Sequence, residues 1–245
     1  MLFFFVCIVL LIQGEINAQS RQNNAESYYQ NGKTHFDNNR FLEAITAYSQ
    51  AIRIDSDFAE AYLYRGQAYL VTNDFNSAMS DLNRAIEIFL NTIGRYDVIM
   101  PGLSDETNRL LNLVAEPRLY DYANAYFIRA TCWSRLNNHD RAIEDGNMAI
   151  RINPRHETAY FDLGQYYGYK EMYDQAIAAF EKTVEIDPKN ADYWIWLGNS
   201  YLKRNLSRDY PKMKMCFEEY LKLTPNGEHA QFARGVLNEL RRLGF

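Results

Sequence analysis

The residue types that most often do chemistry are scattered along this sequence and do not gather into a recognisable site. The four histidines do not pair at the spacing of metal ligands, and they stand at His35, His139, His156 and His229. His156 precedes a glutamate, but the second histidine of a zinc-binding helix is missing. The sequence also lacks a glycine-rich phosphate loop and a Gly-x-Ser-x-Gly nucleophile turn.

The acidic pairs are equally ordinary. Asp55 and Asp57 lie where a turn is expected, without the glycine that a calcium loop requires, and we interpret them as solvated caps. We therefore predict a non-catalytic protein with no metal and no cofactor. An enzyme or small-ligand protein is kept as a third hypothesis, and it requires an enclosed pocket with converging ionisable side chains.

Composition limits the class of partner. The chain has 245 residues with 26 Lys and Arg against 31 Asp and Glu, a formal net charge of −5. A nucleic-acid binder needs a basic surface that neutralises phosphates, so we expect no nucleic-acid partner. The 19 Tyr and 14 Phe, with few Gly and Pro, indicate a folded chain with a substantial core.

The first residues are typical of a secretion signal. The apolar run from Leu2 to Ile12 is too short for a bilayer span, which takes roughly 20 residues. A small residue, Ala18, follows at a suitable cleavage point, so we expect a signal peptide over 1–18 and a polar leader over 19–24. No Lys or Arg precedes the run, which leaves an atypical signal or an internal start open. We expect export to the periplasm or outside the cell, with no stable membrane span after cleavage. A cytoplasmic location is the second interpretation.

One small residue recurs at a fixed period and predicts the architecture. Gly32, Gly66, Ala130, Gly164 and Gly198 are spaced by 34, 64, 34 and 34 residues. We interpret this as five copies of one unit, with a 30-residue insertion between the second and the third. In the first four copies an alanine follows twelve residues later, at positions 44, 78, 142 and 176.

The copies resemble the tetratricopeptide repeat (TPR) family. The fifth reads Trp194, Leu197, Gly198 and Tyr201 at the family's first-helix spacing, and the fourth ends on Pro188. The resemblance implies an all-α, right-handed superhelical stack of helix-turn-helix units that acts as a protein-protein interaction scaffold. It places repeats one and two over 25–92 and repeats three to five over 123–225.

The recurring glycine predicts close helix packing. A glycine inside a helix costs roughly 1 kcal/mol relative to alanine, so a packing reason is needed. A small residue on the first helix, opposite an alanine on the second, lets the two axes approach. Large aromatic residues then fill the space between successive units.

Three segments depart from the repeat. The insertion over 93–122 predicts a short helix that starts near Ser104 and ends at Pro117, and we favour a packing role over a binding role for it. In the fifth copy three extra residues fall within 205–210, and Met213 and Tyr220 replace the usual alanines. The tail over 226–245 predicts an amphipathic capping helix. Cys132 and Cys216 are expected to be buried reduced thiols.

The resemblance also implies a binding surface. In this family the first helices of the repeats line a concave groove, and carrying the register over gives two rows that we predict to contact a partner segment. The first row is Tyr29, Leu63, Phe127, Phe161 and Ile195, and the second is Lys33, Gln67, Thr131, Gln165 and Asn199.

The same rows argue against one known mode of binding. A TPR subclass grips a C-terminal carboxylate with Lys, Asn and Arg, and from that set these rows contain only Lys33 and Asn199. We therefore expect no carboxylate clamp. The partner is expected to be another protein or peptide, and the structural alternative is a homo-oligomer in which the fifth copy and the cap pack on a second subunit.

Overall fold

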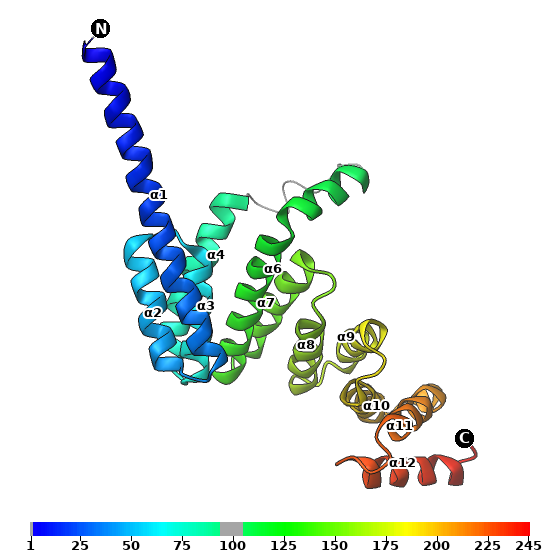
Figure 1. Ribbon diagram of the computed structural model, residues 1–245. Coiled ribbons are helices and arrows are strands. Elements are labelled where there is room, and N and C mark those ends of the chain that lie inside the picture. The colour runs from blue at the N-terminus through cyan, green and yellow to red at the C-terminus, as the bar shows by residue number, and fades with distance from the viewer. Residues whose placement is uncertain (1, 94–104) are drawn as a thin grey trace. The chain divides into compact units, whose positions relative to one another are not determined.

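The computed structural model describes the backbone of residues 2–93 and 105–245, with side chains for residue 15, 19–92 and 118–245. Every regular element in these ranges is a helix, and the helices form pairs (Figure 1). The predicted all-α stack of helix pairs is thereby confirmed. The chain forms two units, Met1–Cys132 and Trp133–Phe245, each described below by itself.

The described part of the first unit contains two helix pairs and most of the long helix α6 (Asp105–Arg135). α1 (Leu2–Asp37) packs with α2 (Phe41–Ile54), and α3 (Ala59–Val71) packs with α4 (Phe75–Ile93). Within each pair the two helices are joined by a tight turn, in which Asn39 and Asn73 adopt φ values of 58° and 61°. Asparagine tolerates this left-handed conformation better than most residues, which explains its place in these turns.

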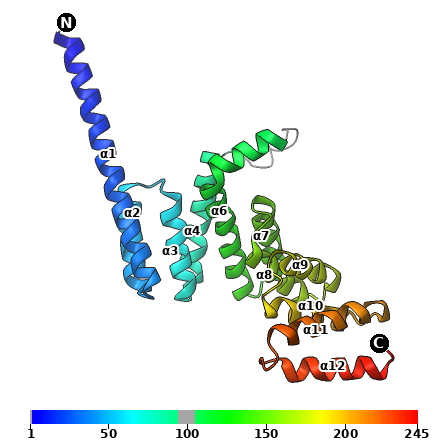
Figure 2. The ribbon, with the colours of Figure 1, turned by 45° about the vertical axis from the view of Figure 1, so that its right-hand side comes forward.

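The long helix corrects the expected boundary of the insertion. α6 (Asp105–Arg135) runs through Pro117 without ending there. A proline inside a helix removes one backbone hydrogen bond and bends the axis more readily than it stops the helix. Figures 1 and 2 show α6 as a bent helix. The expected turn at Pro101 and the helix start at Ser104 lie outside the described residues.

The N-terminal segment is helical. α1 runs as one continuous helix through residues 19–24, and the predicted signal peptide over 1–18 and polar leader over 19–24 stay predictions. On the exposed side of this helix, hydrogen bonds link side chains one turn apart. The Gln30 amide donates to the Glu26 carboxylate, and the Thr34 hydroxyl donates to the backbone carbonyl of Gln30. In the part of the chain that the structure describes, no helix is long and apolar enough to span a bilayer.

The second unit begins inside α6 and continues with shorter helices. It contains α7 (His139–Ile152), α8 (Glu157–Tyr169), α9 (Tyr173–Ile186), α10 (Ala191–Arg204), the 3₁₀ turn η1 (Ser207–Asp209), α11 (Tyr210–Leu223) and α12 (Ala230–Arg242). α8 packs with α9, α10 packs with α9 and α11, and α12 covers α11. The expected capping helix thus occupies the C-terminal end of this unit (Figure 2).

Two of the recurring glycines lie against an aromatic ring sixteen residues later, and Gly66 lies against Leu82 at the same spacing. A Cβ on Gly32 would come within 2.5 Å of the Tyr48 ring, and one on Gly164 within 2.7 Å of the Phe180 ring. The nearest neighbour of these glycines is therefore the residue sixteen positions later, and the alanine at position twelve lies beside that ring. Both rings are fully buried, so this contact lies in the core of these two helix pairs.

The fifth repeat contains the longer turn where it was expected. Asn205 ends α10 with φ 52°, and η1 follows. Arg204 grips Asp209 through two hydrogen bonds of 2.8 and 2.7 Å, and Asp209 is only 4% exposed. Met213 and Tyr220 are buried, and the Tyr220 hydroxyl accepts a hydrogen bond from the backbone N–H of His229. Cys132 and Cys216 are buried as expected.

Candidate functional site

The ten residues expected to contact a partner separate into buried and accessible groups. Tyr29, Leu63 and Ile195 are at most 7% exposed and form part of the core. The others are partly exposed, and they are Lys33, Gln67, Phe127, Thr131, Phe161, Gln165 and Asn199. Residues up to Thr131 belong to the first unit and those from Phe161 to the second, so each group is considered in its own unit.

In the first unit two residues of the expected rows, Tyr29 and Lys33, contact Tyr64, which belongs to neither row. The Lys33 ammonium lies 5.7 Å from the ring centroid of Tyr29 and 5.6 Å from that of Tyr64. The Tyr64 hydroxyl donates to Asp121 over 3.4 Å, and burial together with nearby Glu60 raises the pKa of Asp121 to about 6. Lys33 is therefore engaged by two aromatic faces. The absence of a carboxylate clamp stays a prediction.

In the second unit Phe161 holds an aromatic cluster together. Its ring centroid is 5.7 Å from Phe180, 5.2 Å from Tyr193 and 6.0 Å from Trp196. Offset and edge contacts at these distances stabilise beyond the area that they bury. Phe161 thus positions its aromatic neighbours, and Trp196 presents the exposed side of the cluster.

A hollow of about 520 Å³ lies beside this cluster, and we call it the aromatic hollow. It is formed by side chains of α8, α9, α10 and α12. Gln165 and Asn199, both expected from the sequence, line it together with Tyr169, Trp196 and Phe232. The three aromatic side chains are between 37% and 61% exposed, so they are available to a ligand.

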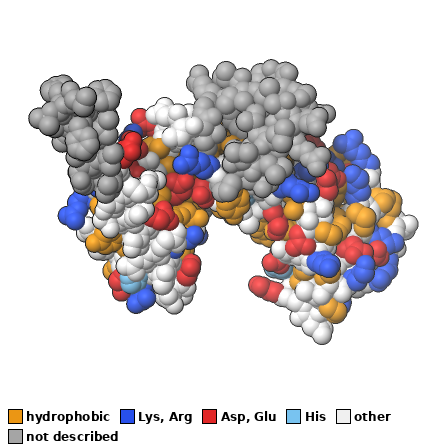
Figure 3. All heavy atoms as spheres, turned by 45° about the horizontal axis from the view of Figure 1, so that its top comes forward, with side chains coloured by type: hydrophobic (Ala, Val, Ile, Leu, Met, Phe, Trp, Pro, Cys, Tyr) orange, Lys and Arg blue, Asp and Glu red, His pale blue; other side chains and the backbone are white. Residues whose placement is uncertain are grey.

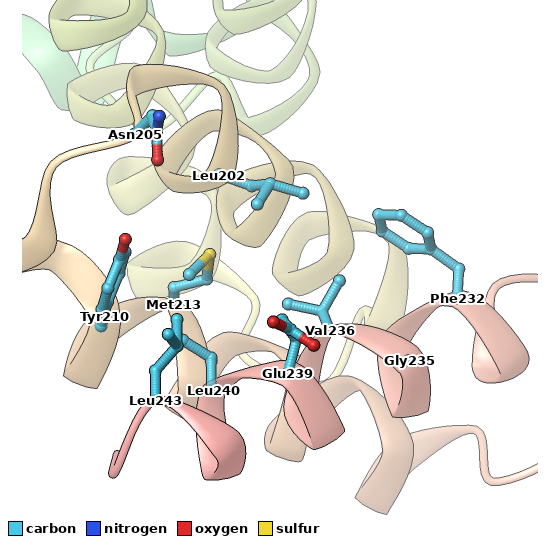
Figure 4. A pocket seen from close by; sticks show the side chains of 10 residues that line it. All are labelled: Leu202, Asn205, Tyr210, Met213, Phe232, Gly235, Val236, Glu239, Leu240 and Leu243. Atoms are coloured by element: carbon cyan, nitrogen blue, oxygen red, sulfur yellow. The ribbon is translucent and has the colours of Figure 1, made fainter.

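A second hollow of about 480 Å³ lies between α10, α11 and α12, and we call it the cap hollow. Its lining is mostly apolar and consists of Leu202, Asn205, Tyr210, Met213, Phe232, Gly235, Val236, Glu239, Leu240 and Leu243. Figure 4 shows Leu202 and Phe232 extending from α10 and α12 into the space between these helices. These two residues line both hollows, which makes the hollows neighbours.

The charged groups around the hollows are few. Glu171 and Lys203 line the aromatic hollow, and Glu239 lines the cap hollow. Glu239 pairs with Arg242 over 3.2 Å. Figure 3 shows one face of the molecule, on which hydrophobic side chains reach the surface between charged ones. The hollows are therefore equipped to bury apolar groups and to satisfy amide groups.

The titratable side chains elsewhere in this unit have structural roles. His156 caps α8 by accepting from the Ala159 N–H over 3.4 Å, and burial lowers its pKa to about 4. Burial raises the pKa of Asp162 to about 6, and its carboxylate accepts from the Tyr166 hydroxyl. Across the described ranges no three metal-binding side chains gather into one site.

The residues predicted from the sequence overlap only in part with those that line the two hollows. Gln165 and Asn199 were expected, whereas Trp196, Leu202 and Phe232 were not. Trp196, Asn199 and Leu202 recur every three residues on α10 and so share one face of that helix, a signal that was present in the sequence. Phe232 could not be placed from the repeat, because the tail lies outside the 34-residue period.

Family models match three stretches of the chain. Two models described as tetratricopeptide repeat match residues 59–92 and 158–190, and one described as TPR repeat matches 32–72.

Among curated relatives, small glutamine-rich tetratricopeptide repeat-containing protein 2 of Mycosarcoma maydis is 39% identical over 62 residues, 25% of this chain and 18% of that protein. The DnaJ homolog subfamily C member 7 homolog of Dictyostelium discoideum is 24% identical over 200 residues, 80% of this chain and 34% of that protein. The chain thus matches about a fifth to a third of their length.

Solved structures share the fold over most of the chain. A MamA protein aligns with a TM-score of 0.60 at 22% identity, covering 85% of this chain and 95% of that one. YrrB, described as a TPR protein with an unusual peptide-binding site, aligns with a TM-score of 0.60 at 19% identity, covering 91% and 97%. Identities this low carry the fold alone.

Proposed function

This chain belongs to the tetratricopeptide repeat family, and from that premise we propose that it binds a segment of a partner protein in the two hollows of its second unit. The observation that carries the proposal is the continuity of the aromatic and cap hollows through Leu202 and Phe232. Adjoining hollows with exposed aromatic walls are the kind of surface on which partner side chains anchor.

The lining indicates how a segment would be held. Trp196 and Phe232 offer large, rigid apolar surfaces at little entropic cost, and the cap hollow is spacious enough for one large side chain. Gln165 and Asn199 offer amide groups that pair with a partner's backbone. The role is that of a non-catalytic scaffold, since the hollows offer no nucleophile with an orienting base.

The experiment is selection from a random dodecapeptide library displayed on phage, with the full chain as bait. We expect enriched peptides that bind with micromolar affinity and lose at least tenfold in affinity on Trp196→Ala combined with Phe232→Ala. The matched control is Leu42→Ala combined with Met215→Ala, which removes exposed apolar side chains that line neither hollow. Equal loss in both double variants would place the contact elsewhere.

We also propose that the protein is exported and acts in the cell envelope or outside the cell, on the strength of the apolar run and Ala18. N-terminal sequencing of protein from its native host tests this. The expected first residue is Gln19, and a mature chain that retains Leu2–Ile12 would contradict the proposal.

Self-assembly is the second candidate function. It is favoured by Leu243 and Phe245, which are 54% and 42% exposed at the end of the cap. Multi-angle light scattering separates the candidates, because a monomer at all concentrations excludes self-assembly as the main role.

A further inference from the structure

Most glycines inside the helices have a packing reason. A Cβ on Gly32, Gly66, Gly146, Gly164 or Gly198 would come within 2.5 to 3.1 Å of a neighbouring side chain. Gly168 in α8 and Gly235 in α12 differ, because no described atom outside their own helix lies within 4 Å of where their Cβ would be. A helical glycine costs roughly 1 kcal/mol relative to alanine, and packing within the chain does not repay that cost at these two positions.

Backbone conformation does not explain these glycines either. Neither has a positive φ. The left-handed residue that follows α8 is Glu171, with φ 58°. Glycine is also used where a ligand or another backbone approaches the chain closely.

Both glycines lie in the proposed binding surface. Gly168 lines the aromatic hollow, and Gly235 lines the cap hollow (Figure 4). They belong to α8 and α12, the helices on either side of α10, which contributes the shared Leu202. A segment that fills both hollows therefore crosses α10. It meets helix backbone without a side chain at Gly168 on α8 and at Gly235 on α12.

Charge narrows the class of segment. Residues 203–245 contain nine Lys and Arg against five Asp and Glu, a net charge of +4, whereas residues 1–202 carry a net charge of −9. Among the described residues, Lys203 and Arg208 are exposed and have no ion-pair partner. Glu239 is already paired with Arg242, which leaves Glu171 as the one unpaired acidic group in the lining.

We propose, resting on the proposed function, that the occupant is an acidic polypeptide segment with large apolar side chains, whose main chain passes directly over Gly168 and Gly235. The apolar side chains enter the hollows, and the acidic ones face Lys203 and Arg208. Because no side chain stands at the two glycines, the partner's backbone comes closer to α8 and α12 than any other residue would allow.

The test uses the peptides selected from the random dodecapeptide library and the variants Gly168→Ala and Gly235→Ala of the full chain. Alanine favours the helix and meets no atom, so each variant is expected to unfold at an equal or higher urea concentration than the parent. Affinity for the peptides is expected to fall about tenfold in each variant. These opposite effects on stability and binding separate a ligand role from damage to the fold.

Charge reversal provides the second readout. The selected peptides are expected to contain more Asp and Glu than Lys and Arg, and to bind Lys203→Glu more weakly than the parent. Lys189→Glu is the matched control, since Lys189 is exposed and lines neither hollow. The affinity of the parent for the peptides should also fall as salt is added, because salt screens the attraction between opposite charges.

The outcomes distinguish this inference from the proposed function. Suppose that the selected peptides lose affinity for the Trp196→Ala, Phe232→Ala double variant. If they carry no net negative charge, or if they bind the two glycine variants as tightly as the parent, the inference is overturned and the proposed function stands. If no peptide is enriched, both fail. A concentration-dependent dimer that Gly235→Ala dissociates would assign the hollows to a second copy and also overturn the inference.

Discussion

Gly32 and Tyr48 are in such close contact that a Cβ on the glycine would lie 2.5 Å from a ring carbon of the tyrosine. The ring is fully buried and also packs on Tyr29, with the two centroids 5.9 Å apart. The same relationship recurs between Gly164 and Phe180. A glycine packed against a ring is thus a recurring contact of these helix pairs, and in the second repeat Gly66 packs against Leu82 in the same way.

We predict that Gly32→Ala destabilises the first unit, although alanine favours a helix. The added methyl group meets the ring of Tyr48, and overpacking of this kind costs about 1–3 kcal/mol, which exceeds the gain in helix propensity of about 1 kcal/mol. Urea unfolding followed by circular dichroism measures the change. Gly235→Ala is the matched control, and its urea midpoint should not fall, since open space surrounds Gly235.

The turn between α10 and α11 is expected to depend on one ion pair. Arg204→Gln leaves Asp209 buried without its two charged hydrogen bonds, and removing one partner of a buried pair costs about 3 kcal/mol. Arg84→Gln removes pairs with Asp57 and Glu87, whose side chains are exposed, and should cost much less than Arg204→Gln. Thermal or urea unfolding of the two variants compares them directly. Equal effects would show that Arg204 contributes no more than a surface charge.

The repeat was readable from the sequence because its packing constraint recurs every 34 residues. A residue type that recurs at a fixed period indicates a contact that recurs in successive repeats. The recurrence of Gly32 and Gly164 therefore predicted the close packing of the two helices in a repeat. The period did not predict which positions are exposed, because it cannot separate positions on the surface from positions that face the next helix. Leu63 and Ile195, which the repeat pattern placed in the predicted binding rows, are buried in the core.

The features outside the period explain the remaining differences. Pro117 was interpreted as a helix end, yet one missing N–H is tolerated within α6. Phe232 belongs to the capping helix, which has no counterpart in earlier repeats, so its position beside both hollows followed only from the three-dimensional arrangement. The extra residues after Arg204 were found because they broke the period.

Phe161 is expected to matter for stability more than its partial exposure implies. Phe161→Ala removes ring contacts to Phe180, Tyr193 and Trp196 and should lower the free energy of unfolding by about 2 kcal/mol. The control is Leu42→Ala, which truncates a side chain that is 70% exposed and should change stability by less than about 0.5 kcal/mol. Similar urea midpoints for the two variants would refute the view of Phe161 as the centre of the cluster.

Asp121 provides a prediction about pH. Burial, with Glu60 nearby, raises its pKa to about 6 in the folded chain, against an ordinary value near 4 in the unfolded chain, and Lys33 only partly opposes this. The folded state therefore holds this proton more tightly than the unfolded state. Between about pH 4 and pH 6 the contribution of Asp121 to stability falls as pH rises, and above that window it is constant.

Asp121→Asn isolates this contribution, because asparagine resembles the protonated acid and can still accept the hydrogen bond of Tyr64. The variant and the parent should have similar free energies of unfolding near pH 4. The variant should then become the more stable of the two as pH rises to 6, with no further divergence up to pH 8. Urea titrations at each pH measure the difference, in which the contributions of Asp162 and His156 cancel. A difference that stays constant from pH 4 to pH 8 would show that Asp121 titrates as a solvated surface carboxylate.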